Sequence, residues 1–131
     1  MNEMTPANLH SFLKRFQLRG GRLQRFVVRT RPGDSSIAEI RLLVRELATN
    51  QPVRMRLTFD GVQEYRFQRR PGPGLVRLKE VQFGFFDDLI YLNLDAFPED
   101  GPPKVMDFRA SDCFVGARGL KWEIVARKEA S

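Results

Sequence analysis

The sequence has very few of the residues that build metal sites and nucleophilic active sites. Its 131 residues include one cysteine, Cys113, and one histidine, His10. A lone cysteine forms no internal disulfide, so the composition does not indicate an oxidising compartment. Structural zinc requires several Cys and His ligands at short spacings, which this chain does not supply. We therefore expect no metal site, a buried Cys113 and a His10 on the surface of a helix.

Long apolar stretches are also missing. Uninterrupted apolar runs extend over only a few residues, whereas a membrane-spanning helix needs ~20. Residues 1–6 have no basic start followed by an apolar run, which is the pattern of a secretory signal. The sequence therefore predicts a cytoplasmic protein with no membrane partner.

Motifs typical of enzymes are not found either. The chain has no phosphate-binding loop and no dinucleotide fingerprint. Asp87 and Asp88 form the most obvious carboxylate pair, but adjacent residues of a strand point to opposite faces and would not converge on one substrate. We expect these two residues in a turn. The sequence therefore predicts a protein that is not an enzyme, has no catalytic residues and binds no cofactor.

Positive charge is what the sequence has in excess. The net charge is +6, and residues 1–33 hold seven basic side chains against one acidic side chain. In the remaining 98 residues, fifteen basic side chains balance fifteen acidic ones. This asymmetry is typical of proteins with an anionic partner, although a general excess of arginine would produce it too. The candidate polyanion contacts are Lys14, Arg15, Arg25, Arg29 and Arg31.

The N-terminal segment predicts one helix over residues 5–17. Thr5 is a suitable N-cap, and Pro6 suits the first helical position. Apolar residues recur at helical spacing and form one stripe, made of Leu9, Phe12, Leu13 and Phe16. Gly20 and Gly21 are expected to end the helix.

Strands are predicted for most of the remaining chain. Residues 53–59 and 120–126 alternate apolar and polar side chains, which is the period of a half-buried strand. Trp122 lies on the apolar phase and should be buried. Residues 105–108 are a short strand candidate, and residues 118–119 are expected to form a turn before the last strand.

Two further segments near the N-terminus also fit strands. In residues 22–31, Arg25, Arg29 and Arg31 share one face of the predicted strand. Residues 37–47 fit both a helical and an extended pattern. We favour a strand for them, because an extended segment follows after a short turn.

The dipeptide at residues 60–61, Asp-Gly, suggests a hairpin. A three-residue loop would pair Leu57 with Tyr65 and Met55 with Phe67. A two-residue loop would instead place charged residues on the apolar face, so the first register is expected.

Together these patterns predict a mainly β protein of the α+β type. One N-terminal helix is followed by an antiparallel meander of about seven or eight strands, closed as a sandwich or barrel-like body. A single domain over residues 1–131 is expected. It would comprise the helix at 5–17, a β-rich body at 22–127 and a frayed tail at 128–131.

The sequence resembles known groups of proteins in two respects. Residues 82–86, Gln-Phe-Gly-Phe-Phe, resemble part of the aromatic strand motif of RNA-recognition-motif domains. The basic-glycine pair of that motif is replaced by Val81-Gln82, and Asp88 stands at its final aromatic position. The overall rhythm of strands is similar to that of small β-rich bacterial proteins, some of which act as immunity partners of toxins.

The small number of candidate catalytic groups favours a non-catalytic function. We expect a protein-interaction domain of a small bacterial-type cytosolic protein, immunity-like in kind, with Phe83, Phe85 and Phe86 as the candidate contact patch. The same three residues also suit a hydrophobic core. The alternative is nucleic-acid or other polyanion binding through the basic N-terminal segment. The sequence indicates neither the identity of the partner nor the oligomeric state.

Overall fold

Antiparallel strands make up most of this protein. The computed structural model describes residues 2–30, 36–68, 77–96 and 103–127. The strands are β1 (Asn2–Glu3), β2 (Phe16–Arg29), β3 (Ser36–Glu46), β4 (Gln51–Phe67), β5 (Gln82–Phe86), β6 (Leu89–Asn93) and β7 (Cys113–Arg127), and the helices are α1 (Leu9–Arg15) and α2 (Val105–Arg109). The predicted strand-rich fold with an N-terminal helix is confirmed.

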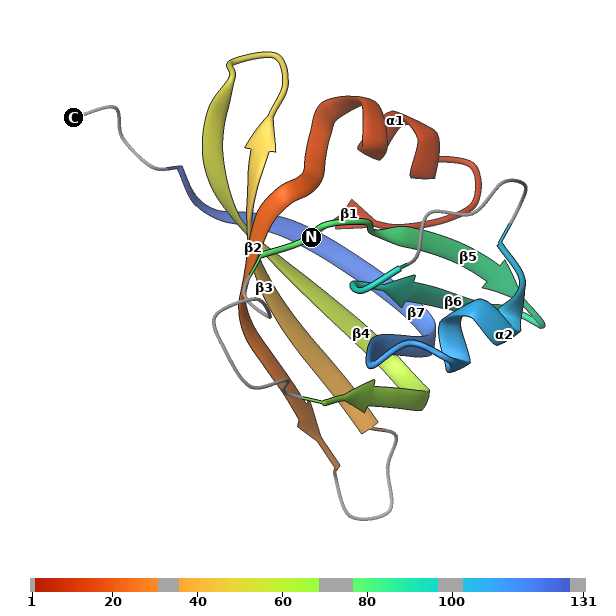
Figure 1. Cartoon of the computed structure of the whole chain (residues 1–131). Helices are drawn as coiled ribbons and strands as arrows, with labels where there is room; N and C mark the ends of the chain where they lie inside the picture. The colour runs from red at the N-terminus through yellow and green to blue at the C-terminus, as the bar shows by residue number, and fades with distance from the viewer. Residues whose placement is uncertain (1, 31–35, 69–76, 97–102, 128–131) are drawn as a thin grey trace.

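All the strands belong to one antiparallel sheet of seven strands (Figure 1). Its order is β2-β3-β4-β7-β6-β5, and β1 pairs with β7. Strands β2 to β4 form one meander and β5 to β7 form a second. The two meanders meet along β4 and β7, which pair from Val53↔Arg127 to Phe67↔Cys113. The predicted meander is therefore interrupted once, between β4 and β5.

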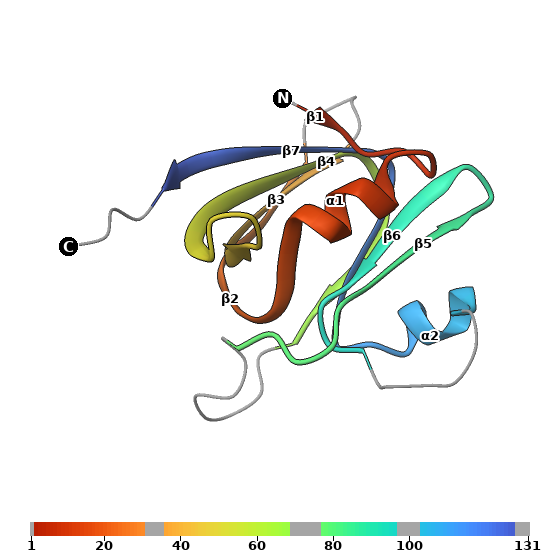
Figure 2. The ribbon, with the colours of Figure 1, turned by 90° about the horizontal axis from the view of Figure 1, so that it is seen from above.

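The sheet curls around α1 and forms a half-barrel (Figure 2). Its two edges are joined where β2 meets the segment that leads into β5. Here the Gly20 N–H donates to the Leu78 carbonyl at 2.8 Å, and the Leu78 N–H donates to the Gly21 carbonyl at 2.8 Å. The concave side of the sheet is consequently enclosed, and the convex side of β2, β3, β4 and β7 faces outward except where α2 covers part of β4 and β7.

The main core fills the concave side. Alternate residues of the central strands, such as Ile40 and Leu57, have no exposed surface. Helix α1 adds Phe12, whose ring centroid lies 5.3 Å from the centroids of both Phe16 and Trp122. Trp122 is 9% exposed, as its place on the apolar phase of the strand predicts.

A second, smaller core lies beneath α2. It contains Tyr91, Phe108 and Phe114, with Phe86 and Leu89 packed against them. Neighbouring residues of β6, such as Ile90, belong instead to the main core. Strand β6 therefore has apolar neighbours on both faces, which explains why its sequence is almost uniformly apolar.

The first helix is shorter than predicted. It begins at Leu9 and ends at Arg15, and Asn8 rather than Thr5 is its N-cap. Thr5 and Asn8 form reciprocal hydrogen bonds, Thr5 N to Asn8 Oδ1 at 2.8 Å and Asn8 N to Thr5 Oγ1 at 3.3 Å. The glycine pair does not end the helix, because β2 has already begun at Phe16 and runs through it.

The predicted hairpin at residues 60–61 is wrong. Strand β4 continues to Phe67, and Leu57 pairs with Ile40 on one side and Trp122 on the other. Gly61 has a φ of +63° and lies close to a register shift between Val62 and Glu64. The Asp-Gly dipeptide therefore bends the strand without reversing it, because β7 supplies a continuous partner.

Two other predicted features are also wrong. Residues 118–119 form no turn, since β7 runs unbroken from Cys113 to Arg127. Residues 105–108 belong to a helix, α2. The Lys104 N–H donates to the Asp107 carboxylate at 2.7 Å at the start of this helix, and carboxylates in the first turn of a helix are stabilising.

Other local predictions are confirmed. Residues 37–47 lie almost entirely in β3, which ends at Glu46. Asp87 and Asp88 form the turn between β5 and β6, with φ of +50° and +63°, as a two-residue hairpin loop requires. The predicted tail at 128–131 and Arg31 lie outside the described residues.

Candidate functional site

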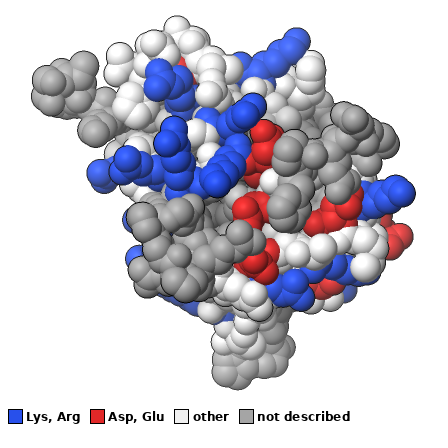
Figure 3. All heavy atoms as spheres, viewed as in Figure 1, with Lys and Arg blue, Asp and Glu red and all other residues white. Residues whose placement is uncertain are grey.

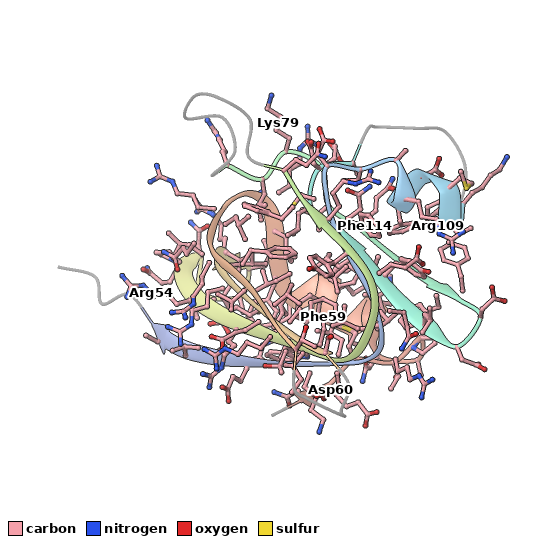
Figure 4. All side chains as sticks on the ribbon, turned by 90° about the horizontal axis from the view of Figure 1, so that it is seen from below. Arg54, Phe59, Asp60, Lys79, Arg109 and Phe114 are labelled. Carbon is pink, nitrogen blue, oxygen red and sulfur yellow. The ribbon has the colours of Figure 1, made fainter. Side chains whose placement is uncertain are left out.

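The convex side of β2, β3, β4 and β7 carries most of its charge as arginine. Along each strand, alternate residues enter the core and the residues between them point outward. Figure 4 shows this for Phe59, which points into the core, and for Asp60 and Arg54, which point away from it. We call this outward surface the arginine face. Over residues 25–29, 37–45, 52–60 and 119–126, its described basic residues are Arg25, Arg29, Arg41, Arg45, Arg54, Arg56 and Lys121, and its described acidic residues are Glu39, Asp60 and Glu123.

The strand register aligns three arginines in a row across this face. Arg25 lies opposite Arg41, and Arg41 lies opposite Arg56. Neighbouring strands are ~4.8 Å apart, and like charges directly opposite each other are destabilising. Such a row is therefore unfavourable for the sheet unless other groups offset its charge.

Two arginines of the row have carboxylate partners. The Arg41 Nε donates to Glu39 Oε1 at 2.9 Å, and Arg56 forms an ion pair with Glu123. Among the described residues, Arg25 has no ion-pair partner. Arg25 is exposed on the arginine face.

A hollow of about 330 Å³ opens beside this row. Its lining residues are Gln24, Arg25, Arg41, Arg54, Met55, Val125 and Ala126. We call it the arginine hollow. The three arginines come from three adjacent strands, and none of the described lining residues is acidic. An anion in the arginine hollow would meet three guanidinium groups and no carboxylate within the lining.

Two β-bulges border the arginine hollow. The pairing of β2 with β3 shifts between Leu23 and Arg25, which leaves Gln24 as an extra residue. The pairing of β4 with β7 shifts between Arg54 and Met55, which leaves Val125 as an extra residue opposite them. Both extra residues line the arginine hollow. Bulges redirect side chains and occur often beside functional sites.

The positive surface continues from the arginine face toward the joined edges of the sheet. Figure 3 shows Lys and Arg side chains gathered over the region where β2 meets the segment before β5. The exposed basic residues there are Arg19, Arg22, Arg77 and Lys79. Arg22 connects this region to the arginine face, because it lies opposite Leu43, which in turn lies opposite Arg54.

The structure separates the predicted polyanion contacts. Arg25 and Arg29 are exposed on the arginine face, as the strand prediction requires. Lys14 and Arg15 lie on α1, away from that face. The Arg15 guanidinium lies 4.9 Å from the ring centroid of Phe16 and forms an ion pair with Glu46 at 3.5 Å. The N-terminal basic segment is therefore not one surface.

Sequence reasoning missed Arg41 and Arg54 as candidate site residues. Both lie in a part of the chain where basic and acidic residues balance, so charge asymmetry did not select them. The alternating patterns of residues 37–47 and 53–59 did place them on the polar phase. Their proximity to Arg25 follows only from the pairing of β2, β3 and β4.

The candidate protein-contact residues do not form one exposed patch. Phe83 is 8% exposed and belongs to the main core, against which Phe85 also packs. Phe86 packs instead against the smaller core beneath α2. The three rings are thus divided between the two faces of β5.

A separate polar cluster holds α2 against β4. Arg109 donates to both carboxylate oxygens of Glu64, at 2.7 and 3.1 Å, and the buried Tyr91 hydroxyl donates to the same carboxylate. The hydrogen bond from Arg109 lowers the pKa of Glu64. Burial raises the pKa of Tyr91, and the hydrogen bond to Glu64 raises it further. The cluster is satisfied internally, which suits a structural role.

The remaining titratable candidates have no catalytic arrangement within the described residues. Burial raises the pKa of Cys113 to about 12, so its thiol is protonated at neutral pH. His10 is exposed on α1. In the described part of the chain, no group of three or more His, Cys, Asp or Glu side chains could hold a metal ion, and no helix is long and apolar enough to span a membrane.

Comparison with protein-family models, with curated proteins and with solved structures finds no match to this chain. The function therefore has to be argued from the geometry of the arginine face.

Proposed function

We propose that this protein binds polyanions, and the phosphate backbone of nucleic acids in particular, through the arginine face. The observation that carries the proposal is the row of Arg25, Arg41 and Arg56 beside a hollow whose described lining has no carboxylate. Sequences usually violate a local rule such as like-charge avoidance where function requires it. Glu39 and Glu123 offset two of the three charges, and a bound polyanion would offset the charge of Arg25.

The electrostatics of the face support a phosphate backbone as the ligand. Arg25, Arg29 and Arg54 are exposed and have no ion-pair partner among the described residues. When one of these side chains contacts a phosphate, counterions condensed on the nucleic acid are released. This release contributes favourable binding free energy. The continuation of positive charge through Arg22 toward the joined edges lengthens the track that a backbone could follow.

Sequence-independent binding is expected. The described lining of the arginine hollow includes no aromatic side chain on which a base could stack. Contacts to phosphate fix the position of a nucleic acid but do not read its sequence. The protein should therefore bind chains of different base composition with similar affinity.

The salt dependence of binding tests the proposal. A fluorescently labelled oligonucleotide is titrated with the protein, and anisotropy is measured at several salt concentrations. Three phosphate contacts, from Arg25, Arg29 and Arg54, contribute a log–log slope of about −2.7, at roughly −0.9 each on duplex DNA. Affinity should then fall roughly 40-fold between about 50 and 200 mM salt.

A matched pair of triple variants assigns the binding to the arginine face. Arg25→Gln, Arg29→Gln and Arg54→Gln together should flatten the slope by about 2.7. The control carries Lys14→Gln, Lys104→Gln and Arg118→Gln, three exposed residues outside the lining of the arginine hollow, and loses the same charge. Equal losses in the two variants, or no binding by the native protein at low salt, would overturn the proposal. The protein-interaction function expected from the sequence stays a prediction that nothing in the structure tests.

A further inference from the structure

The arginine hollow differs in the charge of its lining from three other hollows lined by described residues. The two hollows beside the β5–β6 turn are lined by Asp87 and Asp88. The hollow between α1 and β1 contains Arg15, whose guanidinium already pairs with Glu46. The arginine hollow combines three guanidinium groups with an uncharged remainder. It is therefore suited to a compact anion.

The two bulges give the arginine hollow its shape. A bulge leaves one residue unpaired in the ladder and locally disrupts it. Here two bulges, at Gln24 of β2 and Val125 of β7, lie on the strands on either side of the β3–β4 pair. They turn a regular outward surface into a hollow with arginine at its sides and Val125 and Ala126 in its lining.

The donor groups match a phosphate group. A guanidinium presents N–H donors in a fixed fork that pairs with two phosphate oxygens. Arg25 and Arg54 have both edges of this fork available among the described residues, and Arg41 uses its Nε for Glu39 while its terminal nitrogens have no such partner. The Gln24 amide adds an uncharged donor.

The size and the apolar part of the lining also suit this ligand. A volume of about 330 Å³ corresponds to roughly ten water molecules at about 30 Å³ each. This is room for a phosphate and the sugar to which it is joined. Val125 and Ala126 contribute exposed apolar surface to the lining.

We infer that the arginine hollow is a seat for one phosphate group, held by Arg25 and Arg54 and assisted by Arg41 and Gln24. The inference deepens the proposed function and rests on it, since the seat would fix one phosphate of a bound chain while the rest of the arginine face attracts the chain less specifically. The phosphate is either an internal phosphodiester or a terminal phosphomonoester, and both offer the same oxygens to the guanidinium groups.

Single substitutions distinguish a seat from a uniformly positive face. Arg25→Gln and Arg54→Gln are compared with Arg29→Gln and Arg45→Gln, which lie on the same face but outside the lining of the hollow. The first two should each reduce affinity for a short oligonucleotide about tenfold, the effect of losing a charge-assisted hydrogen bond. The second two should each reduce it only two- to threefold, since a solvent-exposed contact with a phosphate outside the seat contributes less binding free energy.

Lysine substitutions provide a sharper comparison at constant charge. Arg54→Lys keeps the positive charge but removes the planar fork. It should weaken binding several-fold, whereas Arg118→Lys, at an exposed residue beside Asp87 and Asp88, should leave affinity unchanged. The inference would be overturned if the two lysine variants bound the oligonucleotide with the same affinity, or if all four glutamine variants lost the same affinity. The proposed function would still stand if the affinity retained its salt dependence.

Titration with small ligands locates the seat and identifies the source of the phosphate. Backbone amide signals are followed by NMR while inorganic phosphate is added, with sodium chloride at equal ionic strength as the control. Signals of Gln24, Arg25, Val125 and Ala126 should shift with phosphate and not with chloride, and the absence of such shifts would contradict the seat. A trinucleotide is then titrated with and without a 5′-phosphate. If the seat binds a terminal phosphomonoester, Arg54→Gln should weaken binding of the phosphorylated trinucleotide only. If the seat binds an internal phosphodiester, Arg54→Gln should weaken binding of both. Shifts with phosphate but no binding of longer oligonucleotides would retain the seat and overturn the proposed function.

Discussion

The ring of Tyr91 lies directly over Gly116. A Cβ atom placed on Gly116 would be 2.4 Å from Cε1 of this ring. Tyr91 is held there by the rings of Phe86 and Phe108, whose centroids lie 5.8 and 5.5 Å away. The smaller core beneath α2 therefore depends on a glycine in β7.

Replacement of Gly116 by alanine should destabilise the protein. The added methyl group has to displace an aromatic ring that is packed from the other side, and overpacking of this kind costs about 1–3 kcal/mol. Chemical denaturation followed by circular dichroism measures the change. Gly119→Ala in the same strand is the control, because a Cβ there meets nothing within 4 Å. Similar stabilities of the two variants would contradict the packing described for Tyr91.

Trp122 should be a major contributor to the stability of the main core. It is 9% exposed and lies against Phe12 and Phe16, at centroid distances of 5.3 and 5.2 Å. Trp122→Ala should lower the free energy of unfolding by about 3–5 kcal/mol, through lost burial and the cavity left behind. Leu13→Ala on α1, a residue that is 43% exposed, should have an effect below about 1 kcal/mol. A nearly neutral Trp122→Ala would show that this part of the sheet does not enclose the helix.

Glu64 should make the protein sensitive to acid. The hydrogen bond from Arg109 lowers the pKa of this carboxyl below its ordinary value of 4.5. The folded state therefore binds the proton less readily than the unfolded state, so the stabilisation is present above the ordinary pKa and is lost as the pH falls through the lowered one. Glu64→Gln should be less stable than the native protein at pH 7 and should lose less stability below about pH 4.5.

A double-mutant cycle with Arg109→Gln tests whether the ion pair is the cause. Because Arg109 supplies the main stabilisation of the Glu64 carboxylate, the effects of the two substitutions should not add. The coupling free energy between the two substitutions should become smaller at acid pH, where the Glu64 carboxyl is protonated. Additive effects at pH 7 would mean that the pair does not hold α2 against β4.

Cys113 should resist thiol reagents in the folded protein. It is 3% exposed, and burial raises its pKa to about 12. At pH 8, roughly one thiol in ten thousand is then ionised, compared with about a quarter at the ordinary pKa of about 8.5. Modification by a disulfide reagent, followed by absorbance, should be slow in buffer and fast in denaturant. Rapid labelling of the native protein would place Cys113 at the surface.

The sequence by itself determined which segments are strands and which side chains enter the core. In residues 37–47 and 53–59, the apolar residues at every second position fix which side of each strand points into the core. A one-residue shift in strand pairing would expose the whole apolar set. Trp122 was placed in the core for the same reason. The lack of cysteine and histidine clusters likewise limited the candidate chemistry to charge.

Only the tertiary structure decided where strands end. The glycines at positions 61 and 119 suit a turn and also suit a long strand, and the local sequence does not distinguish the two. What distinguished them was β7 beside β4, a partner more than fifty residues away in the chain. Residues 105–108 were too short a segment for periodicity to separate helix from strand.

The candidate site likewise depends partly on the sequence and partly on the tertiary structure. That Arg25, Arg41 and Arg54 point outward follows from alternation within each strand. That they surround one hollow follows from the registers of three strand pairs and from bulges at Gln24 and Val125. Register depends on contacts between distant segments, so no local pattern contains it. The sequence supplied the charges, and the packing of the sheet brought them together.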